Sequence, residues 1–150
     1  MVQGKLLIAA VVGFMTLLAS SHVFAQADVI EQRRKLMKSN SGDAKAIKAA
    51  VETKDYATIE TKAKEIMSNA DQMVGLFPKG STKGKTKAMA AIWEKPDDFA
   101  KDAKDLSKAA GELAQAAASK DAGAVEAKIK AVSGACGACH KAFRAKDYAE

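Results

Sequence analysis

The chain of 150 residues is long enough for one domain once any processed segment is removed. Hydrophobic residues make up 48% of it and charged residues 28%, which permits a buried core in a soluble domain and excludes low-complexity disorder. Aromatic residues are only 5% and prolines number two, whereas alanine occurs 32 times. This composition argues against a β-sandwich or barrel and favours helices, because alanine loses no side-chain entropy in a helix.

The net charge of +6 comes mostly from lysine, since Arg33, Arg34 and Arg144 are the only arginines. Lysines alternate with acids in segments such as 62–65 and 101–105. That pattern is typical of a solvated helix face, and few aromatic residues are available to stack on bases. We therefore expect no nucleic-acid partner.

The first 25 residues have the pattern of a cleaved secretory signal peptide. Lys5 precedes an apolar run over residues 6–19, and Val23-Phe24-Ala25 offers a small residue at the cleavage position. The alternative is a membrane anchor, but the apolar run is shorter than the roughly 20 residues that span a bilayer. We expect cleavage after Ala25, export to the periplasm without stable membrane insertion, and a mature domain over residues 26–150.

Two helices are predicted in the first half of this domain. The first covers residues 28–53, with Asn40-Ser41-Gly42 as a weak point and a break into two helices as the alternative. The second covers residues 55–76 and ends before Pro78. Its apolar residues recur at steps of three and four, the spacing of a core-facing stripe. They are Tyr56, Ile59, Ala63, Ile66, Ala70, Met73 and Phe77.

A long connection over residues 77–95 leads to two further helices. The third is predicted to begin near Pro96, which suits a first helical turn, and the fourth begins at Asp121. Both repeat the bundle spacing, with stripes Phe99, Ala103, Leu106, Ala110, Leu113, Ala117 and Val125, Ile129, Val132, Cys136, Cys139, Phe143. The sequence therefore predicts an all-α, antiparallel up-down-up-down four-helix bundle.

The fourth helix carries the motif Cys136-Gly137-Ala138-Cys139-His140 on its inward face. Covalent haem attachment needs two thiols at the spacing of two vinyl groups and a nitrogen ligand beside them, and C-x-x-C-H supplies all three. We expect one covalent haem c, with Cys136 and Cys139 forming the thioethers and His140 binding iron near the C-terminal helix.

Three other interpretations of the cysteines fit less well. Structural zinc needs four nitrogen or sulfur ligands, and only three remain once His22 leaves with the leader. A thioredoxin-like C-x-x-C needs a βαβ context, and a plain disulfide leaves His140 unexplained. A helical interaction module without haem remains an alternative interpretation only if no haem attaches to the chain.

The mature chain as a whole resembles the class II c-type cytochromes, that is, cytochrome c′ and its low-spin relatives with a methionine ligand. The resemblance rests on the 136–140 motif followed by Arg144, on segment 33–38 and on segment 91–93. It implies the bundle fold, a mono-haem site near the C-terminus, and homodimers in at least some members. Cytochrome c′ is itself a known example of the up-down-up-down bundle.

The resemblance also points to Met37, four residues after Arg33, as the distal ligand of the iron. A buried Arg33 needs a partner, and a haem propionate would serve. The alternative is that Met37 only packs in the core, with Met67, Met73 and Met89 as fallback ligands. Arg144 is expected near the proximal ligand or a propionate.

Trp93 and Phe143 are expected to form part of the haem pocket. An apolar pocket of this kind would raise the reduction potential of the haem. His/Met ligation fills both axial positions, so the expected function is one-electron transfer without catalysis. The alternative is a five-coordinate, high-spin cytochrome c′ that binds NO or CO. Lysines between residues 79 and 87, with Lys141 and Lys146, could form a basic rim that attracts acidic redox partners.

Overall fold

A computed structural model describes the backbone of residues 3–147 and the side chains of residues 28–147. The expected signal segment, residues 1–25, lies outside the residues whose side chains are described. Within residues 28–147, no helix is both long and apolar enough to span a membrane.

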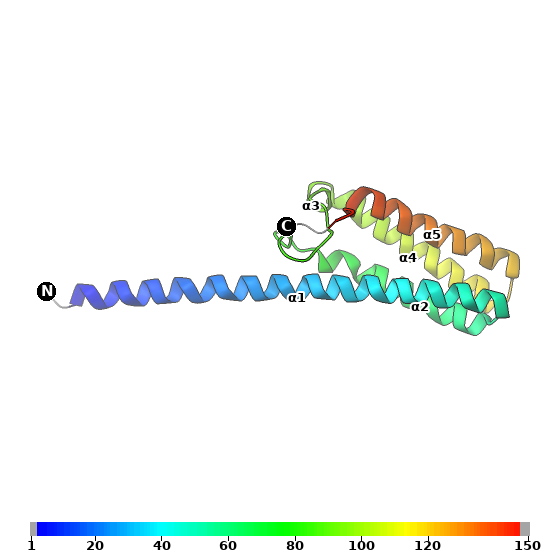
Figure 1. The fold of residues 1–150 in the computed structure, drawn as a ribbon, viewed down its shortest axis with the longest axis horizontal. Helices are drawn as coiled ribbons and strands as arrows, with labels where there is room; N and C mark the ends of the chain where they lie inside the picture. Colours follow the sequence, from blue (N-terminus) through cyan, green and yellow to red (C-terminus); the bar gives the residue numbers. More distant parts are fainter. Residues whose placement is uncertain (1–2, 148–150) are drawn as a thin grey trace.

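The described residues form helices and no strands, as Figure 1 shows. The elements are α1 (Gln3–Thr53), α2 (Tyr56–Met73), the 3₁₀ turn η1 (Val74–Leu76), α3 (Ala91–Glu94), α4 (Pro96–Ala118) and α5 (Ala122–Phe143). The predicted end at Thr53 and the predicted starts of α4 and α5 are confirmed to within a residue. The predicted helix over 55–76 is confirmed as α2 followed by η1, since α2 itself ends at Met73, and the predicted start at residue 28 is not seen, since α1 begins at Gln3. The four-residue α3 was not predicted, because its short sequence carries no helical period.

Helix α1 continues through Asn40-Ser41-Gly42 without a break. Asn40 Oδ1 accepts a hydrogen bond of 2.8 Å from Asn69 Nδ2 on α2, so this turn is held by a cross-helix contact. Of the two alternatives left open by the sequence, one continuous helix is therefore correct.

Local signals in the sequence explain the helix starts. Asp55 and Asp121 each accept a hydrogen bond of 3.0 Å from the backbone N–H three residues later, which caps α2 and α5. Pro96 occupies the first turn of α4, where its missing N–H has no intrahelical partner to lose. The tight turns before the two caps each place a lysine, Lys54 or Lys120, in the left-handed region.

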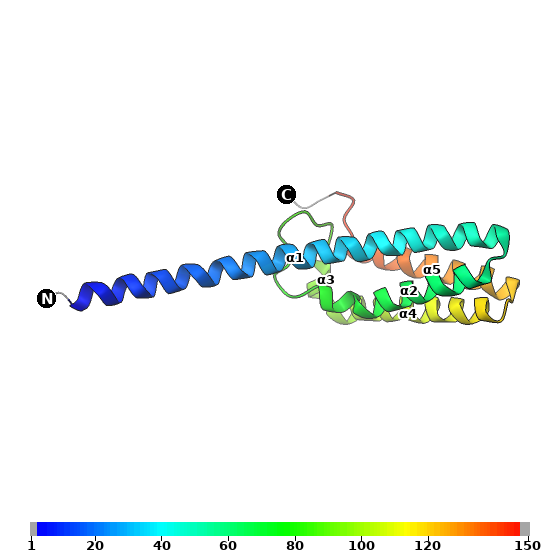
Figure 2. The same ribbon diagram turned by 90° about the horizontal axis from the view of Figure 1, so that it is seen from below.

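The four long helices alternate in direction and form an up-down-up-down bundle (Figures 1 and 2). Helix α1 packs on α2, α2 on α4, and α4 on α5, while the described residues of α1 and α5 make no backbone contact. The buried core follows the predicted stripes, including Ile59, Ile66, Leu113 and Val125. Three of the four sides of the bundle are therefore closed by helix packing, and the side between α1 and α5 is open.

The connection between α2 and α4 closes one end of the bundle. Gly80 and Gly84 adopt positive φ angles of 83° and 119°, which allow its sharp turns. It then pairs with the chain after α5, where Met89 N–H donates to Phe143 O (3.0 Å) and Ala145 N–H donates to Lys87 O (2.8 Å). This pairing places the long connection beside the C-terminal end of the cysteine-bearing helix.

Candidate functional site

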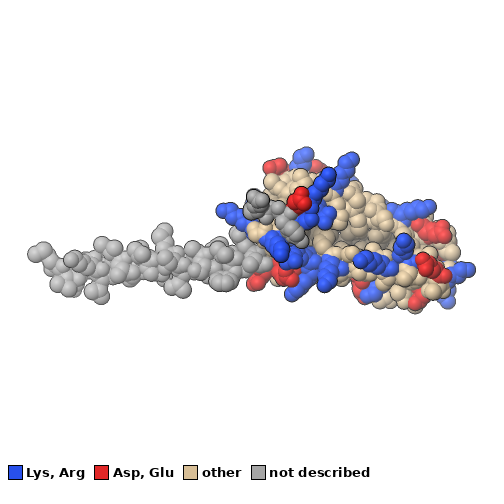
Figure 3. All heavy atoms as spheres, in the orientation of Figure 1, with Lys and Arg blue, Asp and Glu red and all other residues tan. Residues whose placement is uncertain are grey.

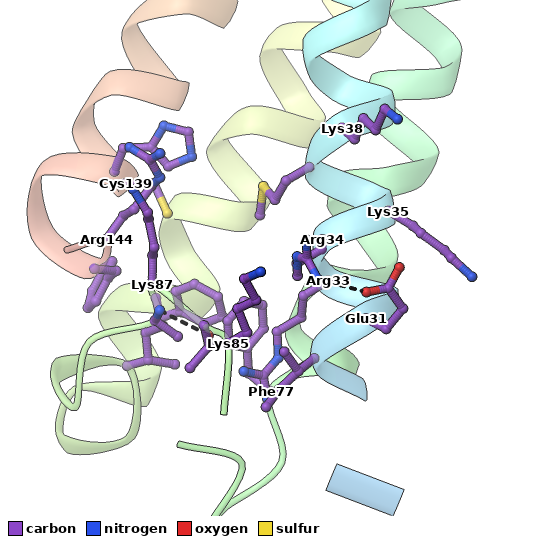
Figure 4. Close-up of a pocket in the computed structure, with 18 residues that line it drawn as sticks. Glu31, Arg33, Arg34, Lys35, Lys38, Phe77, Lys85, Lys87, Cys139 and Arg144 are labelled. Atoms are coloured by element: carbon purple, nitrogen blue, oxygen red, sulfur yellow. Dashed lines mark hydrogen bonds and ion pairs between the residues drawn. The ribbon is translucent and has the colours of Figure 1, made fainter. Parts of the chain in front are cut away.

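A pocket of about 580 Å³ lies between α1 and α5 at the end of the bundle that carries the long connection (Figure 4). This volume is within the range of small-molecule and cofactor sites. The residues that line it are Ile30, Glu31, Arg33, Arg34, Lys35, Met37, Lys38, Phe77, Lys85, Thr86, Lys87, Ala88, Ile92, Phe99, Cys139, His140, Phe143 and Arg144.

The α5 wall of the pocket carries Cys139 and His140, while Cys136 lies one helical turn earlier against the core. Burial raises the pKa of the Cys139 thiol to about 11, with smaller effects from Asp102 and Cys136, and burial also raises the pKa of Cys136. The pKa of His140 is lowered, mainly by burial and also by the nearby Arg144. The imidazole is therefore biased towards its neutral form, which is the form that binds a metal.

The α1 wall carries Met37, which is half-buried and lines the pocket. Met73 is buried in the core, and the sulfur of Met67 packs close to Gly111 of α4. Met89 is exposed in the long connection. Among the methionines of residues 28–147, Met37 alone lines the pocket opposite His140.

Arg33 is buried, with 4% of its surface exposed, and it has hydrogen-bond partners within the chain. Its Nε donates to Leu76 O (2.5 Å), Nη1 donates to Ser81 O (3.0 Å), and Nη2 donates to Ser81 Oγ. The guanidinium also lies 4.3 Å from the ring centroid of Phe77. Burial lowers the pKa of Arg33 to about 10, so it stays charged at neutral pH. These partners belong to η1 and to the long connection, and the expected contact of Arg33 with a propionate stays a prediction.

The two aromatic residues expected in the pocket differ in their positions. Phe143 is buried and lines it, whereas Trp93 does not. The indole N–H of Trp93 is 3.0 Å from the carbonyl oxygens of both Phe77 and Pro78, and its ring packs against Phe77. Trp93 therefore packs against Phe77 without lining the pocket itself. Phe77, whose role the sequence did not reveal, takes the lining position.

Basic side chains surround the pocket opening. Seven lysines and arginines line the pocket against one acid, Glu31, which pairs with Arg34 at 3.0 Å. Figure 3 shows Lys and Arg side chains gathered over this end of the bundle, where α3 and the C-terminus lie. Lys85 and Lys87 belong to the predicted basic rim, while Lys79, Lys83 and Lys141 do not line the pocket. Lys35 and Lys38 also line the pocket, which the helical spacing from Met37 did not predict.

The residues present fit a covalent haem c. An open side of the bundle provides space for a flat ring, and α5 supplies the Cys139 thiol and the His140 imidazole on one wall, with Cys136 one turn earlier on the same helix. Apolar rings and a thioether line the interior, and the cations at the opening suit two propionates. No comparable cluster of three or more His, Cys, Asp or Glu side chains that could hold a bare metal ion occurs in the described part of the chain.

Comparison with known proteins supports this interpretation. Residues 28–144 match the family model described as cytochrome C′. The chain is 36% identical over 150 residues to a cytochrome c′ of Rhodopseudomonas palustris, covering 95% of this chain and 98% of the relative. It is also 44% identical over 75 residues to cytochrome c-554 of Cereibacter sphaeroides, a match that covers 48% of this chain and 56% of that protein.

The fold is likewise shared with solved structures. A cytochrome c′ with a ligand-controlled dimer dissociation superposes with a TM-score of 0.76 at 30% identity, covering 81% of this chain and 97% of the other. The family match over residues 28–144 includes every residue that lines the pocket.

The contacts of Arg33 generate a prediction about Ser81, which is fully buried. Replacing Ser81 by alanine leaves one N–H of a buried guanidinium without its acceptor, so the free energy of unfolding should fall by about 1–3 kcal/mol. Urea denaturation of the haem-loaded protein measures this loss. Ser107→Ala is the control, because Ser107 Oγ donates to Asp71 at an exposed site. Equal losses in the two variants would contradict the assigned role of Ser81.

Proposed function

The chain belongs to the cytochrome c′ family and carries one covalent haem c, and we propose that it is a one-electron carrier whose iron is bound by His140 and Met37. The observation that carries this proposal is the position of Met37. It lines the pocket from α1, while His140 lines it from α5. The other methionines of residues 28–147 lie elsewhere.

In this proposal, each wall of the pocket has a separate role. Bound haem supplies one-electron chemistry between ferric and ferrous iron. Cys136 and Cys139 would hold it through thioethers from α5, and a nitrogen of His140 would bind the iron. Met37 would offer a thioether, which favours the reduced iron and would take the place that a gas or substrate needs. Arg144, four residues after His140, also lines the pocket and would lie near this ligand.

A second candidate function is supported by the names of the relatives. Several long matches are called cytochrome c′, and a five-coordinate site in which Met37 packs without binding iron would react with NO or CO. The same pocket serves both functions. The difference between them is one bond, between the iron and the Met37 sulfur.

Export and assembly belong to the same proposal. Residues 1–25 act as a cleaved leader that sends the chain to the periplasm, and the mass of the purified protein tests this by including or excluding them. The solved relative with a ligand-controlled dimer dissociation supports a homodimer for this chain as well. Sedimentation that gave only the monomer at high protein concentration would exclude the dimer.

The basic pocket opening further suggests acidic redox partner proteins. Excess cations around one opening raise the local concentration of anionic partners, and this attraction weakens as salt screens it. Lys38 on α1 and Lys85 on the long connection both line the pocket. Both elements would contribute to the attraction.

Met37→Leu tests the proposed ligand, because the substitution removes the sulfur while nearly conserving the volume. The wild-type reduced protein should bind CO slowly at neutral pH. The Met37→Leu variant should bind it rapidly, show a high-spin spectrum and have a lower reduction potential. Met73→Leu, in the core, is the matched control and should behave as wild type. Rapid CO binding by the wild type, or no change in Met37→Leu, would favour the gas-binding function instead.

The role of the basic opening is tested with ferricyanide as an anionic oxidant of the reduced protein. Its rate should fall with rising ionic strength, and Lys38→Glu with Lys85→Glu should lower the low-salt rate by roughly tenfold. Lys130→Glu is the control, since Lys130 lies ten residues, about 15 Å, before His140 on α5. Identical salt dependence in all variants would argue against electrostatic attraction at this opening.

A further inference from the structure

A continuous row of side chains crosses the pocket from α1 to α5. The guanidinium of Arg33 lies 4.3 Å from the centroid of the Phe77 ring. Phe77 meets Phe99 edge-on at 4.8 Å between centroids, and Phe99 meets Phe143 edge-on at 5.4 Å. All four residues line the pocket, so the row forms one of its surfaces.

The two ends of this row lie beside the two candidate iron ligands. Arg33 is one helical turn before Met37 on α1, and Phe143 is three residues after His140 on α5. The described parts of α1 and α5 make no direct backbone contact. Phe77 follows η1 and Phe99 is on α4, so the row links α1 to α5 along the pocket lining by way of the end of α2 and of α4.

Both ends of the row are firmly held. Arg33 is fixed by hydrogen bonds to Leu76 and Ser81 in addition to its contact with Phe77. At the other end Phe143 is 5% exposed, and its carbonyl accepts the hydrogen bond from Met89 that closes the pocket wall. Phe99, in the middle, is 4% exposed. Edge-on aromatic pairs have a preferred separation, so a row anchored in this way resists both shortening and lengthening.

We propose that the row Arg33–Phe77–Phe99–Phe143 is a spacer that sets the distance between the α1 and α5 walls, and thereby determines whether the Met37 sulfur reaches the iron. Its members are positioning residues. The inference rests on the proposed function, because it concerns the reach of Met37. It extends that function, because residues that do not bind iron would then determine whether Met37 binds the iron or leaves that position open.

Phe99→Leu is the direct test, since it removes both edge-on contacts in the middle of the row while leaving an apolar side chain. The reduced variant should bind CO about tenfold faster than wild type, because each lost aromatic contact weakens the hold on Met37. Its absorption spectrum should also contain a high-spin fraction. The double variant Phe99→Leu/Met37→Leu should bind CO no faster than Met37→Leu alone, since the ligand whose reach the row controls is then missing.

Leu113→Val is the control for general destabilisation, because Leu113 is fully buried in the core and does not line the pocket. Its CO binding should remain that of wild type. Phe77→Leu provides a second variant in the row, in case Phe99→Leu fails to fold, and the same acceleration is expected. Circular dichroism confirms that each variant is folded before CO is added.

The outcomes separate the spacer from the proposed function. If Met37→Leu accelerates CO binding but both row variants behave like Leu113→Val, the spacer is refuted and His/Met ligation stands. If Met37→Leu changes nothing, ligation by Met37 is refuted, and the spacer that depends on it is refuted as well. Acceleration in the row variants that disappears in the Met37→Leu background supports both.

Discussion

The structure depends on the absence of packing between α1 and α5. Helix packing joins α1 to α2, α2 to α4 and α4 to α5, but not α5 to α1. An apolar slot left open in a small bundle would be costly in water, so the sequence is suited to a bound group that fills it. The covalent haem of this family meets that requirement, and the proposed attachment to α5 would make the cofactor a part of the core. Stability and function are therefore linked through the same slot.

The sequence was sufficient to predict the long helices, because their apolar residues repeat at bundle spacing and their starts carry recognisable caps. It also identified Cys139, His140, Met37, Phe143 and Arg144, all of which line the observed pocket. These residues share a property: each lies at a fixed helical distance from the C-x-x-C-H motif or from Arg33. The spacing of residues along one helix is what a single sequence predicts most reliably.

Contacts between distant segments could not be predicted in the same way. Arg33 was correctly expected to be buried, but its partner Ser81 lies 48 residues away, in a connection with no regular period. The same connection brings Phe77 into the pocket and leaves Trp93 behind it. Its path is set by turns at Gly80 and Gly84 and by pairing with the chain after α5. Such features depend on the completed fold.

The central claim is that the Met37 sulfur completes the axial ligation opposite His140. Nuclear magnetic resonance of the reduced protein with labelled methionine methyl groups tests it most directly, because a methyl group bound above the porphyrin ring experiences a strong ring-current field. The account predicts one methyl resonance shifted far upfield of the others and absent from Met37→Leu. Methyl resonances that all remain in their ordinary range, or a shifted one that persists in Met37→Leu, would contradict it.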